Sequence, residues 1–330
     1  MAEPTRRALV TGLTGQDGSF LAELLLAEGY AVTGLVRGWP RASLGAAEHL
    51  RGQMDAVPGD LLDPESLRAT VREVRPHELY HLAAPSFVPA SWERPAEACA
   101  AIVGATAALL EAVREVDPAI RVFAASTGAI FGEAGESPQH EETRCRPESP
   151  YAIAKLAAQH LVGAMRAHNG VYACSGILYN HESERRPEQF VTRKLTRAAA
   201  AVELGLASEV EVGDLDAVRD WSFAGDVMRG AWLMLQQNRP EDLILSSGVP
   251  HTVAEWARAA FACVGRDADD HVRVASELVR APEVTPMVGD PSRAQQRLGW
   301  RPTIGFEQLV ERMVRADLEE LSASRSAPSG

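Results

Sequence analysis

The stretch Ala8-Leu-Val-Thr-Gly12-Leu-Thr-Gly15-Gln-Asp-Gly18-Ser-Phe-Leu-Ala-Glu-Leu-Leu25 decides the fold of this 330-residue chain. An apolar run leads directly into three glycines, and an amphipathic stretch, Ser19–Glu28, follows them. Glycines at such a turn let the backbone approach a pyrophosphate, and the positive end of the following helix favours the anion. The stretch therefore predicts a strand–turn–helix unit that holds a dinucleotide, although three spaced glycines alone also fit a structural turn.

Short apolar runs alternate with helical patterns through the first half of the chain, which is typical of a parallel sheet covered by helices. We expect an α/β fold of the Rossmann type, with a doubly wound parallel sheet and a smaller C-terminal substrate-binding lobe. The expected strands are residues 8–11, 31–36, 54–57, 78–83, 121–125 and 172–178. The expected parts are the nucleotide-binding domain (1–180, with 218–250 returning to it), the lobe (181–217 and 251–321) and a disordered Ser/Pro/Gly-rich tail (322–330).

The composition argues against several classes of partner. A net charge of −12 disfavours nucleic acid. The four cysteines form no Cys-x-x-Cys pair and the nine histidines show no metal-ligand spacing, so we expect reduced thiols and no metal site. No run reaches the roughly 20 apolar residues of a membrane span, and no signal region precedes the first strand. We therefore expect a cytoplasmic protein with no membrane partner.

Arg37 follows the second expected strand, where an acidic residue would bond to the ribose 2′-hydroxyl of NAD. A guanidinium at this point suits the 2′-phosphate of NADP. The alternative is an exposed arginine at a strand end. We expect NADP, with NAD as the alternative cofactor.

Tyr151 and Lys155 lie four residues apart in a helical pattern and therefore share one helix face. A lysine cation favours the phenolate form of a tyrosine, whose ordinary pKa is about 10. Tyr151 could then take the proton from a sugar hydroxyl while the carbon loses a hydride. Thr127, at the end of the preceding strand, would hold the same oxygen. These three residues are the expected catalytic set.

Together these residues resemble the extended short-chain dehydrogenase/reductase family, and within it the GDP-mannose 4,6-dehydratases, from about Ala8 to Leu318. The motifs that carry the resemblance are Thr11–Leu25, Asn180-His-Glu-Ser183, Phe190-Val-Thr-Arg-Lys194, Arg219-Asp-Trp221 and Leu298-Gly-Trp300. The resemblance implies a nucleotide sugar as substrate, a GDP-sugar in first place, and a homodimer or homotetramer.

The resemblance also assigns the site residue by residue. The implied cofactor residues are Gly12, Gly15, Gln16, Asp17, Gly18, Arg37, Asp60, Leu61, Leu82, Ala83, Ala84, Tyr151, Lys155, His181 and Arg186. The implied substrate residues are Ser86, Ser126, Asn180, Val191, Lys194, Arg219, Arg280 and Glu283.

Four positions depart from the family pattern. Gly128-Ala129 stands where the dehydratases have Ser-Glu, and that glutamate moves protons between C5 and C6 of the sugar as water leaves. An alanine methyl cannot transfer a proton. Glu133 and Glu136 lie near position 129 in the sequence, but the sequence does not place either of them over C5. Phe87 replaces a histidine near the sugar, and Gly38 interrupts an arginine pair of a loop that joins subunits.

These departures favour an NADP-dependent nucleotide-sugar 4-epimerase, an isomerase that needs only Thr127, Tyr151 and Lys155. A GDP-mannose 4,6-dehydratase, a lyase, and a 4-ketosugar reductase are the enzymatic alternatives. A non-enzymatic sensor of NADP or nucleotide sugar is a further alternative, which the retained Tyr151 and Lys155 disfavour.

Overall fold

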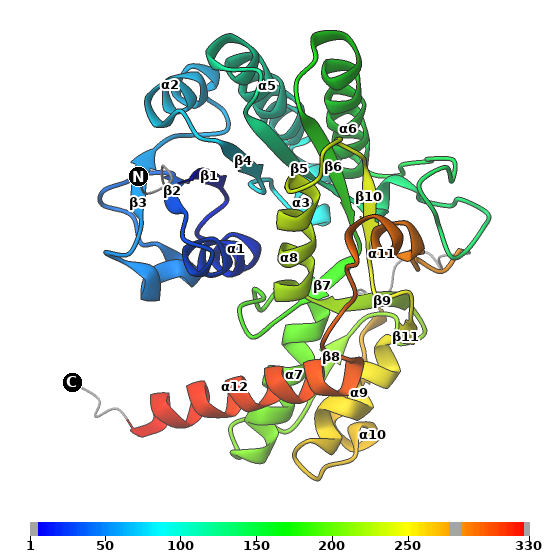
Figure 1. Cartoon of the computed structure of the whole chain (residues 1–330). Coiled ribbons are helices and arrows are strands. Elements are labelled where there is room, and N and C mark those ends of the chain that lie inside the picture. The colour runs from blue at the N-terminus through cyan, green and yellow to red at the C-terminus, as the bar shows by residue number, and fades with distance from the viewer. Residues whose placement is uncertain (1–5, 277–284, 327–330) are drawn as a thin grey trace.

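A seven-stranded parallel sheet forms the centre of the larger domain in the computed structural model, which describes residues 6–276 and 285–326 (Figure 1). The strand order is β10-β6-β5-β4-β1-β2-β3. Helices cover both faces, so strands such as β4 and β6 are buried along their whole length rather than at alternate residues. The bounds are β1 (Arg7–Thr11), β2 (Ala31–Val36), β3 (Asp55–Pro58), β4 (Glu78–His81), β5 (Arg121–Thr127), β6 (Ala173–Leu178) and β10 (Leu243–Leu245).

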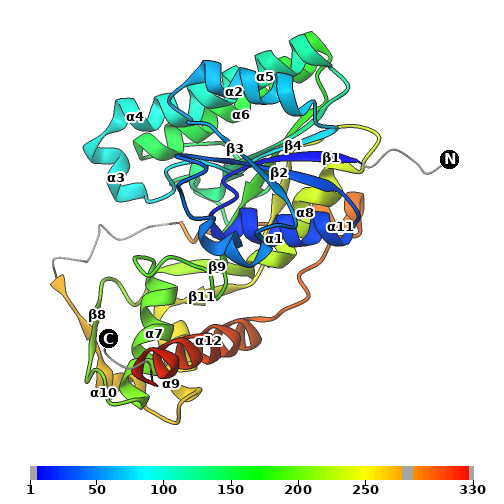
Figure 2. The ribbon, with the colours of Figure 1, turned by 90° about the vertical axis from the view of Figure 1, so that its left-hand side faces the viewer.

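The helices form one layer on each side of this sheet (Figure 2). One layer contains α1 (Gln16–Ala27), α8 (Ala224–Leu235) and α11 (Ser292–Leu298). The other contains α2 (Pro64–Val74), α3 (Val88–Glu93), α4 (Pro95–Cys99), α5 (Ala105–Val116) and α6 (Pro150–Asn169). The chain order reverses between β1 and β4, which opens a crevice at the carboxyl ends of these strands.

The smaller lobe contains a second sheet, of order β11-β9-β7, and a two-stranded sheet of β8 and β12. Its strands are β7 (Asn180–Glu182), β8 (Val210–Val212), β9 (Val218–Phe223), β11 (Pro250–Thr252) and β12 (Val272–Val274). Its helices are α7 (Val191–Glu203), α9 (Val253–Ala262), α10 (Ala268–His271) and α12 (Phe306–Ser326).

Three boundaries differ from the sequence-based expectation. α11 was expected in the smaller lobe, but it packs on β10 and α8 of the larger domain. β9 was expected within the segment that returns to the larger domain, but it pairs with β7 and β11, and the return begins at α8. Residues 322–326 were expected in a disordered tail, but they continue α12. Strand pairing places β9, and continuation of the helix places residues 322–326. Neither effect is visible in the composition of these segments.

One helical run, Pro95–Val116, is apolar and long enough to span a membrane, with a mean hydropathy of 1.6, so the expectation that no such run exists is wrong. α4, a π turn (Ala100–Gly104) and α5 form a single helix here. More than half of it is buried, and it contacts α2 and α6 as a core helix does.

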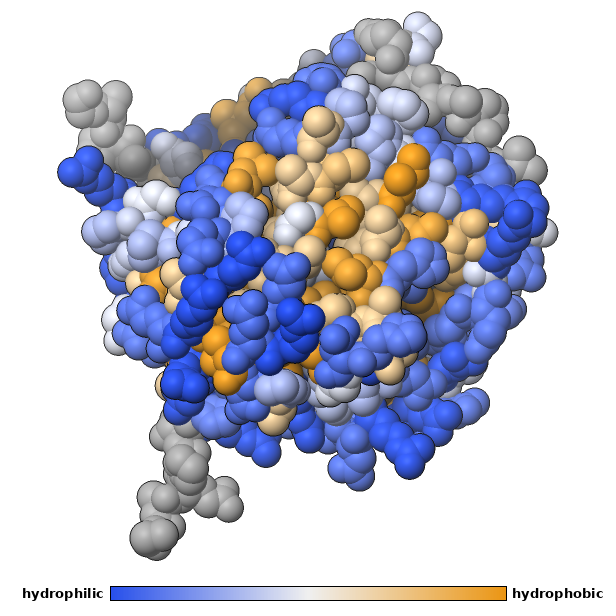
Figure 3. Space-filling model, turned by 90° about the horizontal axis from the view of Figure 1, so that it is seen from above, coloured by the Kyte–Doolittle hydropathy of each residue, from blue (hydrophilic) through white to orange (hydrophobic). Residues whose placement is uncertain are grey.

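The view onto the layer that contains α2, α5 and α6 shows apolar side chains gathered among polar ones (Figure 3). Trp92 on α3 and Ile153 on α6 are among the exposed large apolar residues, at 63% and 52% exposure. The oligomeric state, a homodimer or homotetramer, stays a prediction.

Candidate active site

The glycine turn between β1 and α1 forms a cradle that has no room for side chains. Gly12 has φ +77°, and a Cβ there would lie 2.8 Å from the backbone nitrogen of Ala83. A Cβ on Gly18 would lie 2.2 Å from the carbonyl oxygen of Gly12. No side chain caps α1 at Gly15, so its first N–H groups face the crevice uncapped. The cradle therefore fits a pyrophosphate at a helix N-terminus.

The other expected cofactor residues follow strands that end at the same edge of the sheet. Leu82, Ala83 and Ala84 follow β4, Asp60 and Leu61 follow β3, and the exposed Arg37 follows β2. The structure thus places these six residues along the carboxyl edge beside the glycine turn.

Thr11 belongs to this edge although the sequence analysis did not select it. Its hydroxyl accepts the Ala83 N–H at 3.1 Å and lies 2.9 Å from Nδ1 of His81. It thereby ties the end of β1 to the end of β4. Its sequence signal was a polar residue ending an apolar strand immediately before Gly12.

Asp17 and His181 form a partly buried pair that joins the two lobes, with Oδ2 of Asp17 3.0 Å from Nε2 of His181. Burial alone would raise the pKa of Asp17, but His181, Gln16 and Arg186 together lower it to about 2. Burial alone would lower the pKa of His181, but Asp17 raises it. Four of the expected cofactor residues therefore meet in one network, although up to 170 positions separate them (Gln16 to Arg186).

The expected catalytic residues converge beside this network. Thr127 ends β5, and Tyr151 and Lys155 lie one turn apart on α6, whose N-terminus is capped by the Ser149 hydroxyl. Tyr151 and Lys155 are buried, and the Thr127 side chain is hydrogen-bonded to Tyr151. Nζ of Lys155 donates to the Ala125 carbonyl at 2.7 Å and lies 5.9 Å from the centroid of the Tyr151 ring.

The protonation of Tyr151 differs from the expectation. Burial raises its pKa to about 12, although Thr127 and Arg186 act to lower it. Burial also lowers the pKa of Lys155 to about 8. The Lys155 ammonium is directed at a backbone carbonyl, so in the protein alone it does not produce the phenolate that the four-residue spacing suggested.

Ala129 lies next to Tyr151. It packs against the apolar cluster that contains Tyr151, Ile102 and Ala158. Its N–H donates to the Thr127 hydroxyl at 3.2 Å. A methyl group therefore packs against this cluster at the position where the family pattern has a carboxylate.

The two glutamates near Ala129 in sequence are bound elsewhere. Oε2 of Glu133 accepts the Thr285 N–H at 3.0 Å and the Thr285 hydroxyl at 2.9 Å. Glu136 is exposed and accepts the Thr143 hydroxyl. Neither contact directs a carboxylate toward Tyr151.

The expected substrate residues come from both lobes. Asn180, Val191, Lys194 and Arg219 lie on β7, α7 and β9 of the smaller lobe, and Ser86 lies before α3. Ser126 is buried, and its hydroxyl donates to Oε1 of Gln159 at 2.6 Å. Arg280 and Glu283 lie outside the described residues. The substrate roles stay predictions.

Two aromatic rings, those of Phe87 and Phe190, pack edge to face. Phe87, which replaces the family histidine, packs edge-on against Phe190 with centroids 6.1 Å apart. The Arg186 guanidinium lies over Phe190 at 3.6 Å from its centroid. Phe87 is 37% exposed, so it offers an apolar surface where a histidine would offer a hydrogen bond.

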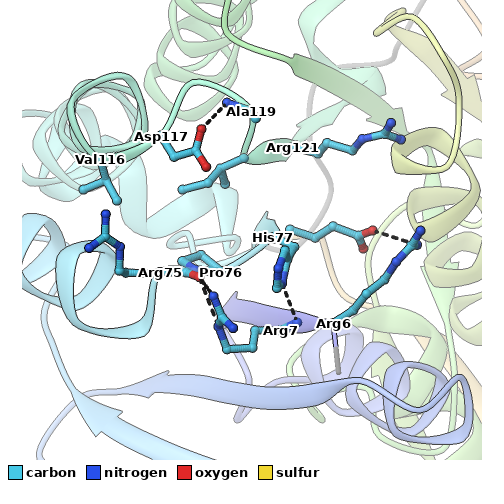
Figure 4. A pocket seen from close by; sticks show the side chains of 11 residues that line it. Arg6, Arg7, Arg75, Pro76, His77, Val116, Asp117, Ala119 and Arg121 are labelled. Atoms are coloured by element: carbon cyan, nitrogen blue, oxygen red, sulfur yellow. Dashed lines mark hydrogen bonds and ion pairs between the residues drawn. The ribbon is translucent and has the colours of Figure 1, made fainter. Parts of the chain in front are cut away.

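A cavity of about 330 Å³ lies away from this chemistry, at the amino-terminal edge of the sheet (Figure 4). Its arginines are engaged with the protein: Arg7 donates to the Arg75 carbonyl at 2.7 Å, and Arg6 lies 3.7 Å from Glu78. These arginines hold the C-terminus of α2 and the start of β4, which is a structural role.

Known proteins resemble this chain along nearly its whole length. The family model described as GDP-mannose 4,6 dehydratase matches residues 9–313. GDP-mannose 4,6 dehydratase 1 of Arabidopsis thaliana is 42% identical, over 97% of this chain and 91% of its own. The Homo sapiens GDP-mannose 4,6 dehydratase is 38% identical over 99% and 95%.

Solved structures share the fold. The UDP-glucose 4-epimerase of Thermus thermophilus in complex with NAD has a TM-score of 0.82 and 28% identity, over 94% of this chain and 98% of its own. RMD from Pseudomonas aeruginosa complexed with NADPH has a TM-score of 0.79 and 25% identity, over 96% and 100%.

Proposed function

This chain belongs to the GDP-mannose 4,6-dehydratase family, and on that basis we propose that it removes water from the sugar of a nucleotide sugar, GDP-mannose in first place. The observation that carries the proposal is the 42% identity to a dehydratase along 97% of the chain. Thr127, Tyr151 and Lys155, gathered at the cofactor crevice, support it.

The preference for an isomerase over a lyase is wrong. Relatives that are 42% and 38% identical over nearly the whole chain are dehydratases. Ala129 affects only one proton-transfer step, whereas the identity to the dehydratases extends across the whole chain. The epimerases resemble this chain in fold at lower identity, 28% in the Thermus thermophilus enzyme.

The proposed mechanism begins at C4 of the sugar. Tyr151, as the phenolate, would take the proton of the C4 hydroxyl, Thr127 would hold that oxygen, and the Lys155 charge would favour the phenolate, which burial disfavours in the protein alone. The glycine turn and Lys155 would hold a nicotinamide cofactor, which would supply the hydride acceptor for C4 and the hydride donor for C6. The ketone at C4 makes the C5 proton acidic, so C5 can lose it while the C6 hydroxyl leaves as water, and C5 regains a proton when C6 receives the hydride.

The step at C5 and C6 needs a proton carrier that residue 129 does not supply. The proton lost from C5 and the proton gained by the leaving hydroxyl must therefore travel through water or another side chain. We propose that Ala129 makes this step slow relative to oxidation at C4.

Ala129 favours a second function, the reduction of a 4-ketosugar. In that reaction Tyr151 would give the proton to the oxygen and a bound NADPH would supply the hydride for C4, so no carboxylate at position 129 is required. Substrate and product differ from those of dehydration, so one set of assays separates the two functions.

The purified protein should be incubated with GDP-mannose without added cofactor, and separately with a GDP-4-keto-6-deoxyhexose and NADPH, and the products followed by mass. Loss of one water in the first incubation supports dehydration. A gain of two hydrogens confined to the second supports reduction. A sugar isomer of unchanged mass, or no product in either incubation, would overturn both functions.

For the cofactor we propose NADP, on the basis of Arg37. Hydrogen bonds to charged groups contribute about 1.5–3 kcal/mol, so Arg37→Ala should weaken NADPH binding about 10- to 100-fold and leave NADH binding unchanged. Fluorescence titration of both cofactors measures the two affinities. Arg41→Ala, which removes another exposed arginine of the same loop, is the matched control. Equal weakening of both cofactors would argue against the assignment.

A further inference from the structure

A small internal cavity lies behind Lys155, between strands β4, β5 and β6 and helix α6. Its polar lining consists of His81, Thr106, Ser126, Lys155, Gln159 and Ser175, and the Thr106 hydroxyl is already used by the Ile102 carbonyl. It leaves about 10 Å³ for the centre of a water molecule, which is close to the space that one water needs.

Ser175 presents an unsatisfied hydroxyl to this cavity. The residue is 0% exposed, and Oγ has no hydrogen-bond partner in the protein. The backbone N–H of Ser175 is already used, because it donates to Oδ1 of Asp242 at 2.7 Å. Buried hydroxyls almost always have a partner, either protein or ordered water. The free hydroxyl therefore points to a water in the cavity.

His81 offers a second polar group on the same cavity. Its Nδ1 lies 2.9 Å from the Thr11 hydroxyl, which leaves Nε2 for another partner. Burial, together with the charge of Lys155, lowers the pKa of His81 to about 3, so the ring is neutral. A neutral imidazole has one donor and one acceptor nitrogen, and either can bind water.

The Lys155 ammonium is the third group. It has three N–H donors, and one of them bonds to the Ala125 carbonyl at 2.7 Å. The ionisable groups that face it are His81 from β4, Tyr151 from its own helix and, through space, Asp17 from α1. A water in the cavity would give the buried ammonium a further acceptor.

We propose that the cavity holds one structural water, hydrogen-bonded to Ser175 Oγ, His81 Nε2 and Lys155 Nζ, through which Ser175 and His81 keep Lys155 charged beside Tyr151. Ser175 and His81 are thus positioning residues that act through Lys155. The identity of the sugar does not enter this inference, and its test uses neither substrate nor turnover.

The chain contains only two lysines, Lys155 and Lys194, so the test can observe Lys155 directly. Protein labelled with [ε-13C]lysine is titrated by NMR, and Lys194→Arg assigns the two signals. Ser175→Val removes the hydroxyl and fills the cavity. It should lower the pKa of Lys155 by about one unit, a tenfold rise in its acid constant, because the buried ammonium loses an acceptor.

Milder variants and a control keep the test decisive. Ser175→Ala should shift the pKa of Lys155 in the same direction by less, and His81→Gln should shift it less than His81→Leu. Ser246→Ala is the matched control, since Ser246 is another fully buried serine without a partner and does not line this cavity.

A crystal structure of the unmodified protein should show an ordered water in the cavity. An empty cavity, or a Lys155 pKa that is the same in Ser175→Val, Ser175→Ala and the unmodified protein, would overturn the proposal. A shift of equal size in Ser246→Ala would do so too, because it would show a general loss of packing.

Discussion

Replacement of Tyr151 by phenylalanine should reduce oxidation at C4 of the sugar by a factor of about 10² to 10⁴, the usual contribution of a general acid or base. The ring packs against Ile102, Ala154 and Ala158, and phenylalanine keeps these contacts, so the free energy of unfolding should change little. Only the hydroxyl that accepts the C4 proton is lost. A single-turnover assay that follows product by mass measures the loss.

Tyr172→Phe is the matched control. The Tyr172 hydroxyl donates to the carbonyl oxygens of Met234 and Gln237, away from the crevice. Its removal should leave turnover unchanged. Turnover by Tyr151→Phe within a factor of about ten of the unmodified protein would show that another group is the base.

Introduction of a carboxylate by Ala129→Glu should raise the rate of water loss by a factor of about 10² to 10⁴, since it restores a proton carrier at C5 and C6. Residue 129 packs against the apolar cluster that contains Tyr151. Burial there should raise the pKa of the new carboxyl, which helps it to donate a proton to the leaving hydroxyl. The measurement is the rate at which GDP-mannose loses water.

Ala129→Gln separates proton transfer from shape. Glutamine fills the same space as glutamate and carries no titratable proton, so it should not increase water loss. An equal increase in both variants would mean that the side chain acts by packing. No increase in a folded Ala129→Glu protein that binds its cofactor would show that residues such as Phe87 also limit the reaction.

Local patterns were enough to predict the first half of the fold. β2 occupies 31–36 as expected, and β1, β3 and β6 begin and end within one residue of the expected strands. The proximity of Tyr151 and Lys155 followed from the four-residue spacing on a helix. Such features depend on neighbours within a few residues, and their periodicity is visible in the chain itself.

Features that join distant segments could not be predicted in this way. β9 pairs with β7 and β11 instead of following the chain back into the main sheet. Asp17 meets His181 across 164 positions. Ser175, in the middle of an apolar strand, carries no sequence signal, whereas Gln159, one helical turn after Lys155, could have been selected by spacing.

The sequence by itself determined the glycine cradle and the identity of the proposed catalytic side chains, including the alanine at position 129. Only the tertiary structure decided their chemical state: burial raises the pKa of Tyr151 and lowers the pKa of Lys155, and packing places Ala129 against an apolar cluster. The physical reason is that spacing along a chain determines local geometry, whereas charge and solvation depend on everything that packs around a group.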